Sequence, residues 1–168
     1  MREDKARAYV QLINMEIHFP KKPNLDRLCL MAAQPTPPIF LQPFILNSTN
    51  ISSFIYQHEF FGGKYVFDKL TGQLGCSPGD KVEHRPLKSR LFGNPLNKEV
   101  FGAYLSYKRT AAILEFTLHG ASGHFGKPTA EEDQLVAEHI ARLLGSFGLN
   151  PSIKATGYST VISASLTP

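Results

Sequence analysis

Apolar and polar residues alternate most regularly in the C-terminal third of the chain. Every second residue from Phe101 to Tyr107 is apolar, and so is every second residue from Leu114 to Leu118. Alternation with a period of two is typical of strands that bury one face. The basic pair Lys108 and Arg109 lies between the two runs, so the pattern predicts a β-hairpin.

A helix is expected after this hairpin. Apolar residues recur from Val136 to Phe147 at spacings of four, three and four, which is one face of a helix. Thr129 followed by Glu132 has the spacing of a capping box. In this motif the Thr129 hydroxyl accepts from the amide of Glu132, and the Glu132 carboxylate accepts from the amide of Thr129. Gly148 suits the residue after the helix. A final strand is expected over residues 153–166, bent at a glycine.

The N-terminal part is less regular. Residues 7–19 fit either an alternating strand or one helical face, and their β-branched and aromatic content favours a strand. A short helix is expected over residues 25–33, and four prolines in residues 34–43 favour an extended or irregular segment. Residues 70–98 contain four glycines and three prolines, so we expect an irregular basic loop there.

Composition supports one mixed domain. With 42% apolar and 19% charged residues, the 168-residue chain is globular, and its twelve prolines and thirteen glycines imply more turns than a helical bundle would have. We therefore expect a single α+β domain over residues 1–168, whose antiparallel sheet ends in a hairpin, a helix and a strand. The order strand, helix, hairpin, helix, strand suits a ferredoxin-like sandwich with a long middle insertion.

The sequence also predicts a compartment. No apolar run approaches the roughly 18 residues that span a bilayer, and the charged residues 1–8 lack the apolar core of a secretory signal. Cys29 and Cys76 are too few for a disulfide framework. We expect a soluble, intracellular, cytoplasmic chain with free thiols, no membrane partner and no cofactor.

Positive charge is concentrated in one segment. Residues 81–109 contain seven basic and two acidic residues, a net charge of +5 that leaves −1 for the rest of the chain, whose total is +4. Clustered cations neutralise phosphates, and exposed aromatic rings stack on unpaired bases. The pattern favours a non-catalytic binding or assembly module whose partner is RNA or DNA; an ordinary solvated segment that docks on an acidic protein is the plainer interpretation. The candidate residues are Lys81, Arg85, Lys88, Arg90, Tyr104, Lys108 and Arg109.

A glycine-rich loop between the hairpin and the helix suggests a second function, a small enzyme or an anion-binding protein. Lys127, Gly123 and Gly126 are candidate anion contacts, because amides at a helix N-terminus attract anions. Pro128, which lacks an amide proton, interrupts the phosphate-loop pattern. The alternative is a structural connection into the helix.

The same loop carries titratable groups. His119 and His124, with Ser122 between them and Glu115 on the preceding strand, are candidates for an acid/base pair. A metal site needs at least three convergent ligands, so none is predicted.

A lone thiol is a weaker candidate. Cys76 would lie in an exposed basic loop, where a lowered pKa and His84 as base would make it a nucleophile. Its spacing matches no signature of a cysteine hydrolase, and most lone cysteines are inert.

Aromatic residues suggest a third function, a protein-interaction or structural subunit. Eight of them fall within the 28 residues from Phe40 to Phe67. Most should be core, and an exposed remainder would form a patch for self-association or for another protein.

Overall fold

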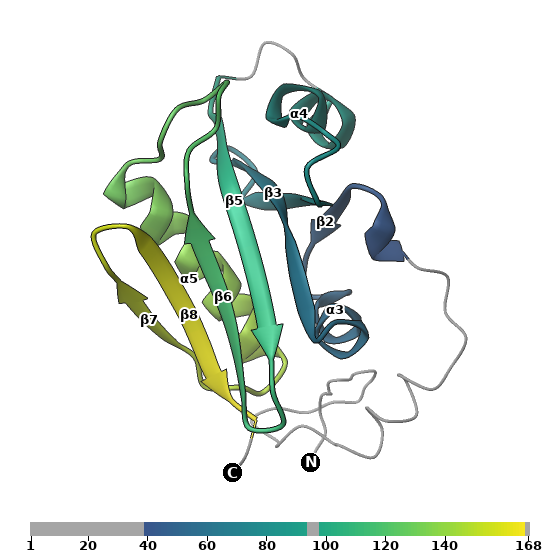
Figure 1. The fold of residues 1–168 in the computed structure, drawn as a ribbon, viewed down its shortest axis with the longest axis vertical. Helices are drawn as coiled ribbons and strands as arrows, with labels where there is room; N and C mark the ends of the chain where they lie inside the picture. Colours follow the sequence, from purple (N-terminus) through teal and green to yellow (C-terminus); the bar gives the residue numbers. More distant parts are fainter. Residues whose placement is uncertain (1–38, 94–97, 167–168) are drawn as a thin grey trace.

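The computed structural model describes residues 39–93 and 98–166, which form one α+β domain around a seven-stranded antiparallel sheet (Figure 1). The strand order is β2-β4-β3-β5-β6-β8-β7, and each neighbouring pair is antiparallel. The elements are the 3-10 helix η1 (Ile39–Leu41), β2 (Phe44–Leu46), α3 (Ile51–Gln57), β3 (Phe60–Asp68), β4 (Gln73–Pro78), α4 (His84–Phe92), β5 (Val100–Arg109), β6 (Ile113–His119), α5 (Ala130–Ser146), β7 (Ser152–Ala155) and β8 (Ser159–Ser165).

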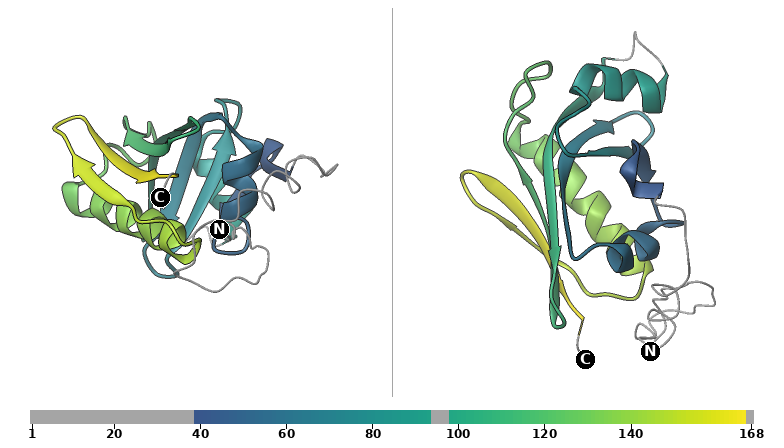
Figure 2. Two further views of the ribbon diagram at one scale, coloured as in Figure 1. Left: turned by 90° about the horizontal axis from the view of Figure 1, so that it is seen from below. Right: turned by 45° about the vertical axis from the view of Figure 1, so that its right-hand side comes forward.

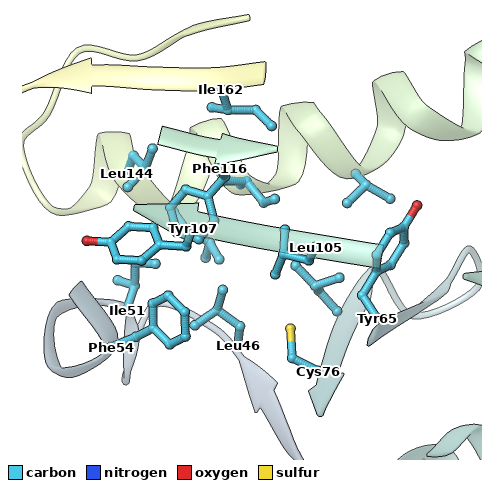
Figure 3. Packing of buried hydrophobic residues seen from close by; sticks show 14 of the residues in the cluster. Leu46, Ile51, Phe54, Tyr65, Cys76, Leu105, Tyr107, Phe116, Leu144 and Ile162 are labelled. Atoms are coloured by element: carbon cyan, nitrogen blue, oxygen red, sulfur yellow. The ribbon is translucent and has the colours of Figure 1, made fainter. Parts of the chain in front are cut away.

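The main core lies on the sheet face that α3 and α5 cover (Figures 1 and 2). Figure 3 shows side chains from β5, β6 and α5 meeting there, among them Tyr107, Phe116 and Leu144. Phe54 of α3 stacks on Phe116 with ring centroids 5.9 Å apart. The alternating apolar residues predicted for β5 and β6 are the ones that point into this core, because successive side chains of a strand face opposite sides.

The opposite face of the sheet, called the outer face below, is covered only in part. Helix α4 packs on its β3–β4 side through a small buried cluster of Val66, Leu87 and Val100. The helix also reaches β5 at His84, but over β6 and β8 no helix of the described residues crosses this face (Figure 1). The side chains that this part of the face presents are therefore half-buried, and most of them are polar. They include Tyr104, Ser106, Thr117, Val161 and Ser163.

Two glycines allow α4 to approach the sheet closely. A Cβ at Gly75 would lie 2.4 Å from Cδ1 of Leu91, and a Cβ at Gly102 would lie 3.0 Å from Cδ2 of His84. Both separations are below ordinary van der Waals contact. The Cβ at Gly102 would also lie 2.3 Å from the carbonyl oxygen of Tyr65 in the neighbouring strand β3. Pro86 does not interrupt the helix, because it falls in the first turn, where its missing amide proton has no intrahelical acceptor.

Several sequence-based predictions are confirmed. Strands β5 and β6 form the expected hairpin, although its turn follows Arg109 and both basic residues belong to β5. The capping box of α5 is complete: Thr129 Oγ1 accepts from Glu132 N at 3.1 Å, and Glu132 accepts from Thr129 N at 3.0 Å. Gly148 follows the helix with φ +91°.

Other predictions are wrong. The expected irregular loop over residues 70–98 contains β4 and α4. The expected single strand over residues 153–166 is the hairpin of β7 and β8.

The ferredoxin-like arrangement is not confirmed, since α4 and α5 lie on opposite faces. The expected strand at residues 7–19 and helix at residues 25–33 lie outside the described residues, and within the described ranges no helix is long and apolar enough to cross a membrane.

Candidate functional site

Two rings stand together on the outer face. Tyr104 of β5 and His119 of β6 are directly opposite in the strand register, and their rings stack with centroids 6.0 Å apart and an interplanar angle of 23°. Tyr104 is half-buried and His119 is exposed. The sequence placed Tyr104 on the face opposite Ala103 and Leu105, and the structure confirms that placement.

A third ring joins this pair from α4. His84, the first residue of the helix, is buried, and its ring meets that of Tyr104 edge-on at 5.4 Å. Its Nε2 lies 2.7 Å from the carbonyl oxygen of Ala103. A carbonyl can only accept, so Nε2 carries the proton. Burial lowers the pKa of His84 and outweighs the opposing effect of this hydrogen bond, so the neutral ring is favoured.

The glycine-rich loop borders the cluster on the other side. A Cβ at Gly120, which has φ +77°, would lie 2.7 Å from Cδ2 of Tyr104, so the backbone passes directly against this ring. Phe125 meets the ring of His84 at 6.3 Å. Loop, sheet and helix thus converge on Tyr104, and no pattern in the sequence predicted that His84 and Phe125 would join it.

The basic residues divide into two groups. Lys81 and Arg85 are exposed next to His84, and Arg90 is exposed towards the end of α4. The other three expected contacts are placed differently. Lys88 is buried, Lys108 lies on the outer face with its Nζ 3.5 Å from Glu115 Oε1, and Arg109 points to the opposite face.

Arg109 has a structural role. Its Nε donates to the carbonyl oxygens of Ile55 at 3.0 Å and of His58 at 3.3 Å, and its guanidinium lies 5.9 Å from the ring centre of Tyr56. These contacts tie α3 to the end of β5. Arg109 is therefore engaged away from the outer face, which corrects its assignment as a contact of the basic segment.

Carboxylates beside the basic segment are offset by a buried lysine. Lys64 of β3 is almost fully buried, with Nζ 2.7 Å from Asp80 Oδ1 and 4.0 Å from Glu83 Oε1. Its hydrogen bond and charge hold the pKa of Asp80 below the usual range. Lys64 therefore balances one of the two carboxylates, and Lys81 with Arg85 leaves this group of five side chains with a net charge of +1.

The loop between β6 and α5 makes its own internal bonds. Ser122 and Gly126 exchange both backbone hydrogen bonds, at 3.0 and 2.8 Å. The hydroxyl of Ser122 accepts from the amides of His124 and Phe125, both at 3.0 Å. The buried Ser122 thus shapes a turn, and four loop amides that could bind an anion are already bonded, while Lys127 and Gly123 are exposed.

The expected acid/base groups have separate neighbours. The ring of His119 lies on Tyr104, the ring of His124 lies 4.6 Å from that of Phe125, and Glu115 pairs with Lys108. Within the described part of the chain, no three His, Cys, Asp or Glu side chains are grouped so as to hold a metal ion.

The expectation of an exposed, reactive Cys76 is wrong. Cys76 lies in β4, fully buried in the main core near Tyr65 (Figure 3), and burial raises its pKa. His84 lies on the outer face of the sheet, so the two residues do not form a nucleophile and its base. Tight turns at residues 71–72 and 79–80 made the strand between them difficult to detect from sequence.

Comparisons with known proteins add no family. No protein-family model matches the chain, and no curated protein and no solved structure is significantly similar to it.

Proposed function

We propose that the outer face beside α4 binds single-stranded nucleic acid without catalysis. Tyr104 and His119 supply a flat aromatic surface for a base, and Lys81 and Arg85 contact phosphates. The observation that carries the proposal is the stacked pair of the half-buried Tyr104 and the exposed His119 on the partly covered outer face, directly next to the first turn of a basic helix. Stacking is tolerant of base identity, because every base has a π-face.

Electrostatics supports the same partner. Lys81, Arg85 and Arg90 are exposed on one helix and the residues before it, while the nearby Asp80 is paired with the buried Lys64. An unbalanced group of cations attracts a polyanion and releases its counterions. An acidic protein would also respond to this charge, but paired rings beside exposed cations combine the two interactions that single-stranded nucleic acid uses, base stacking and phosphate contact, so we favour RNA or DNA.

Salt dependence tests the electrostatic part. Fluorescence anisotropy of a labelled single-stranded oligonucleotide should show log affinity falling linearly with log salt concentration. The double substitution Arg85→Ala with Arg90→Ala should reduce that slope by about 1.4, because each lost phosphate contact removes about 0.7 for a single strand. Arg142→Ala, an exposed arginine on α5, is the matched control and should leave the slope unchanged.

Removal of the ring tests the stacking part. Tyr104→Ala should weaken binding by ~1–3 kcal/mol. Leu135→Ala is the control, since Leu135 is 41% exposed on α5, the helix that covers the opposite face of the sheet. Equal losses in the two variants, or binding that does not respond to salt, would contradict the proposal.

A further inference from the structure

A second exposed aromatic ring lies on the outer face. Phe60 opens β3 and is 71% exposed, whereas its neighbour Phe61 is buried in the main core. The register pairs Phe60 with Lys108 and pairs Gly62 with Ser106, on the same strand face as Tyr104. A single exposed apolar side chain is common on protein surfaces, so its exposure alone carries no inference.

The surroundings of Phe60 are what matter. Its ring lies along β3 over Gly62, where an added Cβ would be 3.7 Å from Cζ of Phe60. Between this ring and Tyr104, the sheet presents small residues, since Ser106 faces Gly62 on one side and Thr117 on the other. Two rings therefore stand at the ends of a strip that carries no bulky side chain.

The length of the strip follows from the register. Lys108, the partner of Phe60, is four residues from Tyr104 on β5, which is about 13 Å at the usual rise of a strand. A stacked strand of nucleic acid advances about 3.4 Å per nucleotide. Four nucleotide steps at most cover this distance, and a more extended strand needs fewer.

A cation stands beside the second ring. Lys108 lies opposite Phe60 with an exposed side chain, and its ion pair with Glu115 joins Nζ and Oε1 at 3.5 Å. Exposed ion pairs of this kind contribute little free energy. The ammonium group can therefore turn to a phosphate at small cost.

We propose that Phe60 is a second base-stacking position, so that one single strand runs along β5 from Tyr104 to Phe60, with Lys108 on its backbone. This inference rests on the proposed function and extends it: the site takes a short single strand, and two bases separated by a few nucleotides bind the two rings.

A ladder of oligothymidylates, from about two to about ten nucleotides, tests the inference by anisotropy. Phe60→Ala should weaken the longer oligonucleotides about 5- to 150-fold, the range that stacking of one base gives, and should leave the dinucleotide unchanged. Leu70→Ala is the matched control, because Leu70 is also 71% exposed but lies beyond the other end of β3. It should have no effect at any length.

Abasic oligonucleotides locate the contact. In a strand of fixed length, removing one base near one end should weaken binding to the wild-type protein and should cause no further loss in Phe60→Ala. Removing the base that meets Tyr104 should still weaken that variant. This non-additivity is expected only if Phe60 and that base touch.

Two results would overturn the inference, and they are distinguishable. If Phe60→Ala behaves like Leu70→Ala at every length while Tyr104→Ala still weakens binding, Phe60 is no part of the site and the proposed function stands. If the wild-type protein binds no oligonucleotide at low salt, both fail. Sedimentation that shows self-association, lost in Phe60→Ala, would then identify a second copy of the chain as the occupant.

Discussion

His84, the first residue of α4, donates a 2.7 Å hydrogen bond from Nε2 to the carbonyl oxygen of Ala103, in the central strand β5. This bond fixes the start of the basic helix next to Tyr104, whose ring meets that of His84 edge-on. Because both groups are buried, the bond is protected from competition by water. The relative position of aromatic and basic side chains on the outer face therefore depends on it.

Substitution of His84 should destabilise the fold. His84→Ala removes a buried ring and its hydrogen bond, and we expect a loss of ~1–3 kcal/mol in the free energy of unfolding. His119→Ala, at an exposed position, should change stability by less than about 0.5 kcal/mol. Urea denaturation followed by circular dichroism measures both. Equal losses in the two variants would show that the bond of His84 does not anchor α4.

Acidification should destabilise the protein. Burial lowers the pKa of His58, His84 and His139 below the ordinary value of about 6.5. The unfolded chain then takes up protons at a higher pH than the folded chain. The stability that the neutral rings contribute is complete above about pH 6.5 and is lost as the pH falls through their lower folded values. Urea denaturation at a series of pH values checks this direction, and His84→Gln should have a shallower pH dependence.

Gly102, which lies against α4, and Gly145, which lies within α5, should respond oppositely to alanine. A methyl group at Gly102 would lie 2.3 Å from the carbonyl oxygen of Tyr65 and 3.0 Å from Cδ2 of His84, so Gly102→Ala should cost about 1–3 kcal/mol by overpacking. At Gly145 in α5 nothing lies within 4 Å, so Gly145→Ala should stabilise by up to about 1 kcal/mol. Thermal and urea denaturation compare the variants. A neutral Gly102→Ala would mean that β3 and α4 together leave room for a methyl group at this position.

Loss of the buried lysine should restore an ordinary pKa to Asp80. In Lys64→Met the carboxylate loses its hydrogen bond and its positive neighbour, so its pKa should rise towards about 3.9. The stability that this pair contributes is present above that value and is lost as the pH falls through the lower folded pKa, so the variant should lack this acid dependence. Titration of the Asp80 carboxyl by NMR measures the shift, and Lys69→Met, which breaks the pair of Lys69 with Glu132 instead, should leave it unchanged.

Removal of the cap should weaken α5. Thr129→Ala loses the hydrogen bond that the amide of Glu132 donates to Thr129 Oγ1, at an expected cost of ~1 kcal/mol. Thr129→Ser keeps the hydroxyl and should retain most of the stability. Urea midpoints compare the three proteins, and a serine variant as unstable as the alanine variant would exclude capping as the cause.

The elements predicted correctly depend on interactions between residues close in sequence. The hairpin of β5 and β6 shows its alternation in the sequence itself, and the spacing of Thr129 and Glu132 defines the start of α5. The same alternation placed Tyr104 on the face opposite the core. In each case the residues that decide the structure lie within a few positions of one another, so the pattern can be read without knowing the fold.

Long-range packing decided the remainder. Gly75 lies inside a strand, because Leu91 of α4 occupies the space of its side chain, and Pro86 lies inside a helix, because it falls in the first turn. The sequence shows neither the packing of Leu91 on Gly75 nor the position of Pro86 in a helix. In the sequence, both Gly75 and Pro86 indicated a loop.

The candidate site follows the same division. The sequence by itself determined that a basic segment precedes a strand with an outward-facing Tyr104. Only the tertiary structure brought His84, His119 and Phe60 to the same face, and directed Arg109 away from it to the backbone of α3. The physical reason is that a strand's own sequence fixes which side chains share a face, whereas strand pairing and helix packing fix which strands and helices that face meets.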